Sequence, residues 1–188
     1  WLASLITGVP FSFTAHAKDL YQGALNPAGL LRRKLEAARF AVTCTATNHA
    51  YLRQVAPAAP VHCVYHGLNA DLAALVAAAP AAPGGAADGF RVLGVGRLVP
   101  KKGFDVLVEA CALLRARGVA LQVRIAGEPG EHTSELRARI AAHKLGQAVT
   151  LTGALGQAAL FAEYRRAGVF CLPCRVLADG DRDGIPNV

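Results

Sequence analysis

Apolar and polar positions alternate along residues 90–172 in a pattern that predicts strands and helices in turn. Short, mostly apolar runs are typical of strands buried in a parallel sheet, whereas apolar residues at every third or fourth position indicate an amphipathic helix. We therefore expect strands near 90–95, 121–126, 148–152 and 168–172. We expect helices near 104–117, 132–144 and 157–167, the second beginning at Thr133 or Ser134 and ending before Gly146. This alternation predicts a parallel α/β sheet.

Residues 1–85 show the same alternation. We expect strands at 10–16, 40–44 and 61–65, and helices at 30–36 and 48–55, with Thr47 or Asn48 as the N-cap of the second helix. The segment 80–89 is rich in proline, glycine and alanine, which predicts a linker. The sequence therefore divides into two α/β domains, residues 1–85 and 86–188.

A basic loop with several glycines, GVGRLVPKKGF at 94–104, separates the strand at 90–95 from the helix that follows. Such a loop lets the backbone approach a phosphate, and the start of the helix directs N–H groups toward it. Arg97 can bind two phosphate oxygens and Lys102 can add a point charge, whereas we expect Lys101 to be an exposed neighbour. The loop lacks the P-loop pattern, and Val99 stands where the dinucleotide-binding motif has its third glycine. The loop therefore predicts a different kind of phosphate site.

Five segments, in order over residues 90–188, together resemble the retaining glycosyltransferases of family 4, which have the GT-B fold of two facing Rossmann-like domains. The segment 96–105 is similar to the family's diphosphate-binding loop, and 125–130 to its next strand and glycine turn. The segment 149–155 is similar to the strand and loop that bind the base. The last two, 169–173 and 183–188, are similar to a buried strand and to the opening of the two-carboxylate motif.

The resemblance implies an α/β, GT-B fold whose two doubly wound, Rossmann-like domains are both incomplete in this chain. Residues 1–85 would be the C-terminal part of the acceptor-side domain, and residues 86–188 most of the nucleotide-sugar donor domain. The residues implied to bind the nucleotide sugar are Gly96, Arg97, Lys102, Gly127, Glu128, Gly153, Ala154 and Leu155.

The resemblance also implies four catalytic residues. Arg97 and Lys102 would hold the diphosphate as it gains charge, and Asp183 would contact hydroxyls of the donor sugar. His16, in a T-x-H-x-x-D segment, would face the cleft and contact the transferred sugar. We expect Asp19 of that segment to organise the loop rather than to act as a base.

The formal net charge of +7 is compatible with nucleic acid, an anionic membrane surface or a phosphorylated ligand. Only 6% of residues are aromatic and no nucleic-acid motif is present, so we exclude nucleic acid and keep the other two. No apolar run reaches the roughly 18 to 20 residues of a membrane span. Because the chain has no methionine and begins at Trp1, we expect it to be an internal piece of a longer protein.

The five cysteines form no recognisable disulfide framework, which is typical of a reducing cytosol. Cys171 and Cys174 have C-x-x-C spacing, but we favour two thiols at the end of a strand over a redox or metal pair. Residues 179–184 match the start of a calcium loop without its distal glutamate, and we disfavour calcium. The histidines show no metal spacing, so we predict no metal site.

We therefore expect retaining transfer of a sugar from a nucleotide diphosphate sugar, of UDP, GDP or ADP type, to a sugar or lipid-linked sugar acceptor. The resemblance implies no metal and no tightly bound cofactor, and it favours bacterial polysaccharide or glycolipid assembly in the cytoplasm. The positive net charge adds the expectation of contact with the inner face of the plasma membrane. The alternatives are a non-catalytic nucleotide-sugar-binding module and another GT-B enzyme, such as an epimerase or phosphorylase. A further alternative is an ordinary dinucleotide-binding Rossmann protein.

Overall fold

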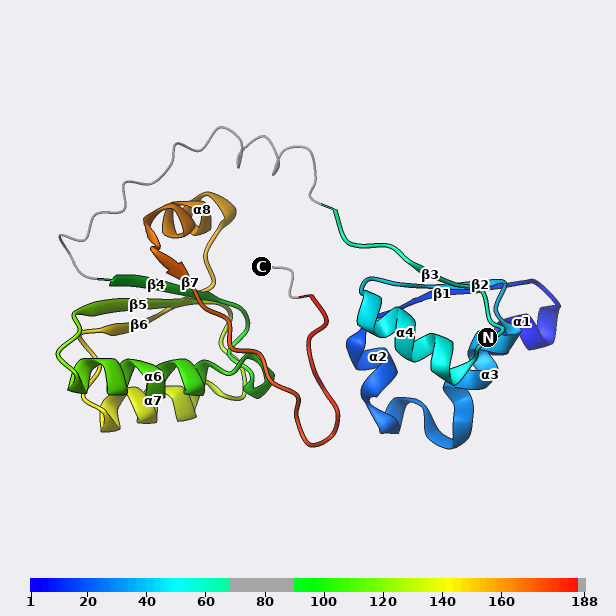
Figure 1. Ribbon diagram of the computed structural model, residues 1–188, viewed down its shortest axis with the longest axis horizontal. Coiled ribbons are helices and arrows are strands. Elements are labelled where there is room, and N and C mark those ends of the chain that lie inside the picture. The colour runs from blue at the N-terminus through cyan, green and yellow to red at the C-terminus, as the bar shows by residue number, and fades with distance from the viewer. Residues whose placement is uncertain (68–89, 186–188) are drawn as a thin grey trace. The chain divides into compact units, whose positions relative to one another are not determined.

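The computed structural model describes residues 1–67 and 90–185, which form two compact units (Figure 1). The first unit contains residues 1–67 together with 176–185, and the second contains residues 90–175. The expected linker at 80–89 and the last three residues of the 183–188 motif lie outside the described residues. No helix in the described part of the chain is long and apolar enough to cross a membrane.

The first unit is built on a parallel sheet of three strands in the order β1-β2-β3. The strands are β1 (Ser12–Ala15), β2 (Phe40–Thr43) and β3 (Val61–Cys63). The helices are α1 (Leu2–Thr7), α2 (Ala17–Tyr21), α3 (Leu30–Ala37) and α4 (Ala46–Val55), with two 3-10 turns, η1 (Gly23–Leu25) and η2 (Pro27–Gly29). Leu35 of α3, Ala41 of β2 and Leu52 of α4 are buried in its core.

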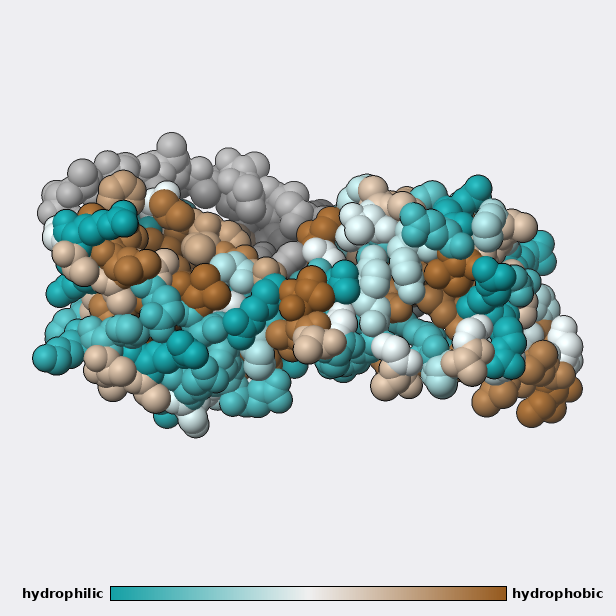
Figure 2. Space-filling model, turned by 60° about the horizontal axis from the view of Figure 1, so that its bottom comes forward, coloured by the Kyte–Doolittle hydropathy of each residue, from teal (hydrophilic) through white to brown (hydrophobic). Residues whose placement is uncertain are grey.

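Helix α1 adds surface rather than core to this unit, since none of its residues is buried. Its apolar side chains, Leu2, Leu5 and Ile6, are exposed. Figure 2 shows the corresponding hydrophobic surface at the end of the unit where α1 lies. The predicted strand at 10–16 corresponds to β1. The sequence analysis did not predict α1 and α2, because both helices are too short to give a periodic apolar pattern.

The second unit has a parallel sheet in the order β6-β5-β4-β7. The strands are β4 (Phe90–Val95), β5 (Leu121–Ala126), β6 (Val149–Gly153) and β7 (Val169–Phe170). Figure 1 shows α6 (Phe104–Ala116) and α7 (Thr133–Ala142) on one face of this sheet and α8 (Gln157–Arg166) on the other. This arrangement confirms the predicted parallel α/β architecture, because helices that connect parallel strands must cross over the sheet faces.

The core of the second unit lies between the sheet and α6. Phe104, Val108 and Cys111 follow one another at helical spacing, so they occupy one face of α6. They are almost completely buried and pack in one cluster with Ile125 of β5 and Leu136 of α7. Full burial of each large apolar side chain contributes about 1.5–3 kcal/mol. This packing fixes the start of α6 against the end of β4.

Two expected helix boundaries are wrong. Helix α4 begins at Ala46, and its N-cap is Thr45, whose Oγ1 accepts a hydrogen bond of 3.0 Å from the Asn48 amide. Helix α7 ends at Ala142, and the left-handed residue that follows it is Lys144, with a φ of 54°, rather than Gly146. The left-handed turn at Lys144 brings Leu145 back into the core, where it is buried.

Candidate functional site

The loops that follow β4, β5 and β6 meet at one edge of the second sheet. Because these strands are parallel neighbours, their carboxyl ends share that edge. The Gly96 amide donates to the carbonyl of Ala126, and the Gly127 amide donates to the carbonyl of Gly153, both at 2.9 Å. The structure therefore brings together all three glycines that the sequence analysis assigned to nucleotide-sugar binding.

Gly127 allows the loops after β4 and β5 to touch. A Cβ at this position would overlap the carbonyl oxygen of Gly96. Beside this contact, the Leu98 amide donates to the carbonyl of Glu128 at 3.0 Å. Only a residue without a side chain fits here, so the close approach of two backbones accounts for the glycine.

Lys102 lies over the glycine loop. A Cβ built on Gly96 would lie 3.2 Å from Cε and 3.3 Å from Cδ of Lys102, so the aliphatic stem packs along Gly96. Lys102 is only 8% exposed, whereas Arg97 is exposed. A lysine can bury its stem in this way while its ammonium group remains near a polar ligand.

Lys101 is buried as well, which corrects the expectation of an exposed neighbour. It belongs to a 3-10 turn, η4 (Pro100–Lys102), and its carbonyl accepts a 2.9 Å hydrogen bond from the Arg175 amide. The segment that leaves β7 thus lies against this turn. The adjacent lysines and the glycines of this loop carry no signal in the sequence for that contact.

Helix α6 begins directly after this turn, and its N-cap, Gly103, has a left-handed conformation with φ of 68°. A Cβ on Gly103 would overlap the carbonyl oxygen of Pro173, so both the backbone conformation and the close approach require glycine. The positive dipole end of this 13-residue helix favours an anion at this position.

Arg175 joins these parts, and the sequence analysis missed it. Its Nε donates to the carbonyl of Pro100 at 3.0 Å, and its Nη1 binds Asp105 Oδ2 at 2.9 Å. Asp105 is 8% exposed, and its Oδ1 is buried with no hydrogen-bond partner among the described residues. The positive charge of Arg175 neutralises the negative charge of Asp105 in the first turn of α6.

The remaining predicted donor residues line the same edge. Glu128 and Ala154 are exposed, and Leu155 is half-buried. Backbone amides, a helix start and the cations Arg97 and Lys102 are suited to a diphosphate. A separate hollow between the sheet and α8 contains none of these residues; it is lined by Arg91, Val92, Leu93, Gln122, Arg124, Thr150, Glu163, Arg166 and Ala167.

His16 lies in the first unit, at the carboxyl end of β1 and at the N-cap of α2. Its backbone amide donates to Asp19 Oδ2 at 2.9 Å, so Asp19 organises this loop as predicted. The His16 ring is exposed. It is therefore accessible at the edge where the first sheet ends.

Asp183 belongs by its contacts to the first unit, although the sequence boundary placed it in the second. The segment around it is anchored on α2. The Arg182 guanidinium lies 4.0 Å from the centre of the Tyr21 ring, and Gln22 Nε2 donates to Asp179 Oδ2 at 2.9 Å. The Asp181 amide and Gln22, both donating hydrogen bonds, lower the pKa of Asp179. Asp183 and His16 thus lie in one unit, and Arg97 and Lys102 in the other.

None of the five cysteines forms a disulfide, and this includes the C-x-x-C pair. Burial raises the pKa of Cys171, which disfavours the reactive thiolate. Among the described residues, the aspartates at 179–183 do not come together as possible metal ligands, whereas His16, Cys44 and His66 lie close enough together to hold a metal ion. The sequence predicted no metal site, because these three residues come from separate loops.

Residues 80–187, more than half of the chain, match the protein family described as "Glycosyl transferases group 1". Over 168 residues, 89% of the chain, 30% of positions are identical in the putative colanic acid biosynthesis glycosyltransferase WcaL of Escherichia coli. Over 97 residues, 52% of the chain, 38% are identical in the amylovoran biosynthesis glycosyltransferase AmsK of Erwinia amylovora. The chain spans 34% and 24% of the length of these relatives.

The fold is that of GT-B glycosyltransferases, as predicted. The structure of Anabaena Alr3699/HepE in complex with UDP is similar with a TM-score of 0.65 and 16% identity. That comparison covers 92% of this chain and 49% of the Anabaena protein.

Proposed function

The chain belongs to the glycosyl transferases group 1 family, and we propose that it serves retaining transfer of a sugar from a nucleotide diphosphate sugar to a hydroxyl acceptor. The observation that carries this proposal is the junction of the three loops at the start of α6, with the stem of Lys102 over Gly96. The likeness to a protein named in complex with UDP supports a nucleoside diphosphate as the ligand of this edge.

In this proposal the diphosphate lies on the loop between β4 and α6. As the bond to the sugar breaks, negative charge develops on the leaving diphosphate, and preorganised cations and amides stabilise it. Lys102 is held in place by packing, whereas the exposed Arg97 reorients to bind two oxygens. The loops at Gly127 and Gly153 and the segment 154–155 contact the nucleoside.

His16 and Asp183 would contact the transferred sugar. Both belong to the first unit. With no carboxylate assigned as a covalent nucleophile, the acceptor hydroxyl attacks from the face that the diphosphate leaves. The departing diphosphate then accepts the acceptor's proton, and the anomeric configuration is retained.

The relatives named for colanic acid and amylovoran biosynthesis favour an acceptor in bacterial polysaccharide or glycolipid assembly. Such an acceptor is a sugar or a lipid-linked sugar. The net charge of +7 supports contact of the chain with an anionic membrane face. If the fraction of protein that co-sediments with anionic vesicles falls as the salt concentration rises, this contact is supported. Co-sedimentation that does not change with salt concentration would contradict it.

The donor site is tested by thermal unfolding of the full chain with UDP, GDP, ADP or NADH. A ligand at one hundred times its Kd stabilises the folded state by about 2.7 kcal/mol. We expect one nucleoside diphosphate to stabilise the protein and the Arg97→Ala/Lys102→Ala variant to lose that shift. Arg115→Ala/Arg137→Ala, which removes two exposed cations of α6 and α7, is the matched control and should keep it.

Since Lys102 is buried, its removal also tests the fold, so Arg97→Ala alone must show the same weakened binding. Stabilisation by NADH alone, or equal stabilisation in the control and the test variants, would contradict the proposed site. Transfer itself is checked by the anomeric configuration of the product in NMR spectra. Binding of the diphosphate without any turnover would identify a binding module instead of an enzyme.

A further inference from the structure

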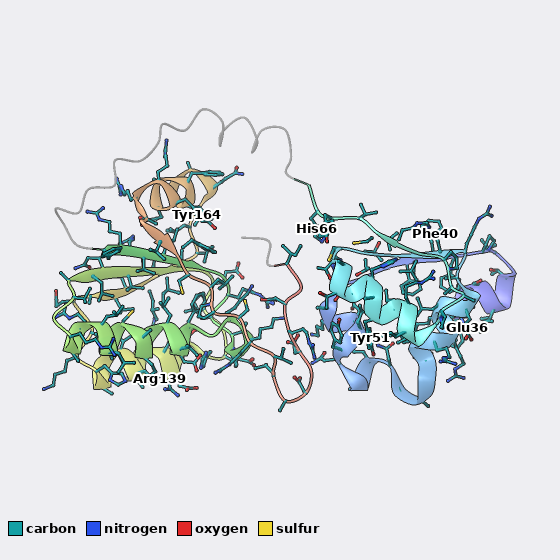
Figure 3. The ribbon with its side chains drawn as sticks, viewed as in Figure 1. Glu36, Phe40, Tyr51, His66, Arg139 and Tyr164 are labelled. Carbon is teal, nitrogen blue, oxygen red and sulfur yellow. The ribbon has the colours of Figure 1, made fainter. Side chains whose placement is uncertain are left out.

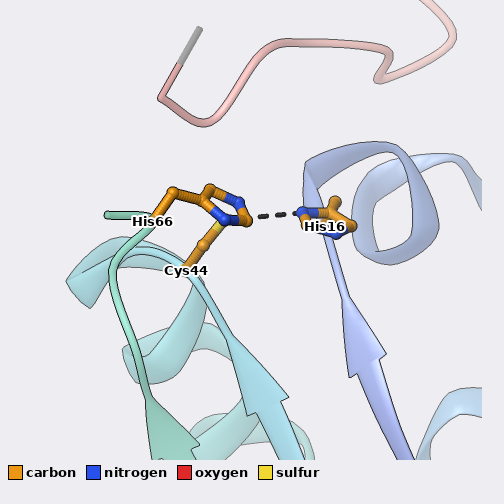
Figure 4. Close-up of side chains that lie close together, drawn as sticks. All are labelled: His16, Cys44 and His66. Atoms are coloured by element: carbon orange, nitrogen blue, oxygen red, sulfur yellow. Dashed lines mark hydrogen bonds between the residues drawn. The ribbon is translucent and has the colours of Figure 1, made fainter. Parts of the chain in front are cut away.

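Three potential metal ligands converge at the carboxyl edge of the first sheet. His16 directly follows β1 and Cys44 directly follows β2. His66, which is labelled in Figure 3, lies on the segment after β3. Because β1, β2 and β3 are adjacent and parallel, their ends share one edge. One ligand atom from each residue lies within 4.8 Å of the others (Figure 4).

We propose that His16, Cys44 and His66 form a binding site for a zinc-like divalent cation, with water as the fourth ligand. Zn²⁺ prefers four tetrahedral ligands drawn from cysteine sulfur and histidine nitrogen. Bonds of about 2.1 Å to nitrogen and about 2.3 Å to sulfur place such ligands roughly 3.6 Å apart. His16 Nδ1 lies 3.6 Å from Cys44 Sγ, which matches that edge of a tetrahedron.

His66 completes the set with a small adjustment. Its ring stacks on that of His16, with the centroids 5.4 Å apart and an interplanar angle of 17°. Both rings are exposed, so a rotation about side-chain bonds can bring their nitrogens to the cation without disturbing the core. Cys44, by contrast, is only 4% exposed, so the thiol presents its sulfur from inside the unit.

Hydrogen bonds connect the three backbone segments that carry the ligands. The Thr43 hydroxyl donates to the carbonyl of Ala15 at 2.9 Å, which joins the residues before Cys44 and His16. The Val64 amide donates to the carbonyl of Thr43 at 2.8 Å, which joins the segment of His66 to the same point. Ligands held on rigid elements lose little conformational entropy when a metal binds.

The ligand chemistry selects the metal. Thiolate and imidazole favour Zn²⁺ and its transition-metal relatives, whereas Mg²⁺, Ca²⁺ and Mn²⁺ favour carboxylate, carbonyl and water oxygens. Binding converts the Cys44 thiol to a thiolate and releases its proton to the solvent. The metal bound at this site would therefore differ in type from the oxygen-preferring cations, such as Mg²⁺, that accompany a diphosphate.

The site also has a consequence for sugar transfer, which rests on the proposed function although metal binding itself does not. His16 is the residue proposed to contact the transferred sugar, and a bound cation would occupy its ring nitrogen. The segment that carries Asp183 lies beside the same place, since a Cβ on Gly184 would be 3.4 Å from Thr45 Cγ2 and 3.8 Å from Ala17 Cβ. Zn²⁺ is therefore expected to inhibit transfer.

The proposal is tested by titrating the untagged, fully reduced chain with Co²⁺, which takes the place of Zn²⁺ and is visible spectroscopically. We expect one equivalent to produce a sulfur-to-cobalt charge-transfer band and the intense visible bands of a tetrahedral site. Zn²⁺ should displace Co²⁺ and remove both signals. The absence of a charge-transfer band with excess Co²⁺ would overturn the proposal, whatever the outcome of nucleotide binding or transfer assays.

The variants identify the ligands. Cys44→Ser should abolish the charge-transfer band, and His66→Ala should lower Co²⁺ affinity by at least about tenfold. Cys63→Ser on β3 and His62→Ala, which change a thiol and an exposed imidazole of the same unit, are the controls and should bind Co²⁺ normally. Because Cys44 is buried, circular dichroism must show its variant folded, while the exposed His66 gives an independent test. A band that persists in Cys44→Ser, or unchanged affinity in His66→Ala, would refute the assignment.

Discussion

Replacing Gly127 by alanine should separate the two loops that form the proposed diphosphate site. The new Cβ would overlap the carbonyl oxygen of Gly96, and both partners are backbone atoms that no side-chain rotation can move. The end of β5 must therefore shift away from the end of β4. Overpacking of this kind costs about 1–3 kcal/mol.

The shift also strains two hydrogen bonds between the loops. These are the bond of 2.9 Å from the Gly96 amide to Ala126 and the bond of 3.0 Å from the Leu98 amide to Glu128. Each hydrogen bond contributes about 0.5–1.5 kcal/mol to stability. We expect the shift to weaken both bonds without breaking them, so only part of this contribution is lost. We therefore expect Gly127→Ala to lower the free energy of unfolding of the second unit by about 2–4 kcal/mol.

Gly146→Ala is the matched control, because an added Cβ there has no atom within 4 Å. Its effect should stay within about 0.5 kcal/mol. Two compact units need not unfold in one step, so the assay is hydrogen exchange followed by mass spectrometry, which reports each unit separately. Peptides around 96–98 should lose protection in Gly127→Ala, while β1, β2 and β3 keep theirs. Equal protection in Gly127→Ala and Gly146→Ala would refute the steric argument.

Three further predictions concern a helix cap, a thiol and a carboxylate. Thr45→Ala removes the N-cap of α4 and should cost about 1 kcal/mol in chemical denaturation, whereas Thr45→Ser should restore it; equal stability of all three would contradict the cap. Burial raises the pKa of Cys111 to about 11, so at pH 8 iodoacetamide should modify the exposed Cys174 but spare Cys111 until denaturant is added, as judged by peptide mass spectrometry; early labelling of Cys111 would contradict its burial. Hydrogen bonds, chiefly from His143, lower the pKa of Glu109, so the stabilisation is present above the ordinary carboxyl pKa and is lost as the pH falls through the lowered value. The Tm difference between the parent and Glu109→Gln should therefore shrink in acid, and a constant difference would exclude this linkage.

The sequence by itself determined the strands and the longer helices of both units, but not the short helices α1 and α2. Strands and helices occur where apolar periodicity placed them, because the period depends on local backbone geometry and on which face is buried. The parallel order of strands then required loops such as 96–103 to lie at the carboxyl edge of the sheet. That the loops at Gly96, Gly127 and Gly153 meet follows from this topology. Their role in donor binding stays a prediction.

Only the tertiary structure decided which side chains those loops bring together. The burial of Lys101, the tether from Arg175 to Asp105 and the convergence of His16 with Cys44 each join residues far apart in the chain. No local pattern encodes such contacts, because they depend on how the whole sheet packs and where its neighbouring strands end. A residue's type and spacing predict the chemistry it could perform, whereas the partner that makes this chemistry available is supplied by the fold.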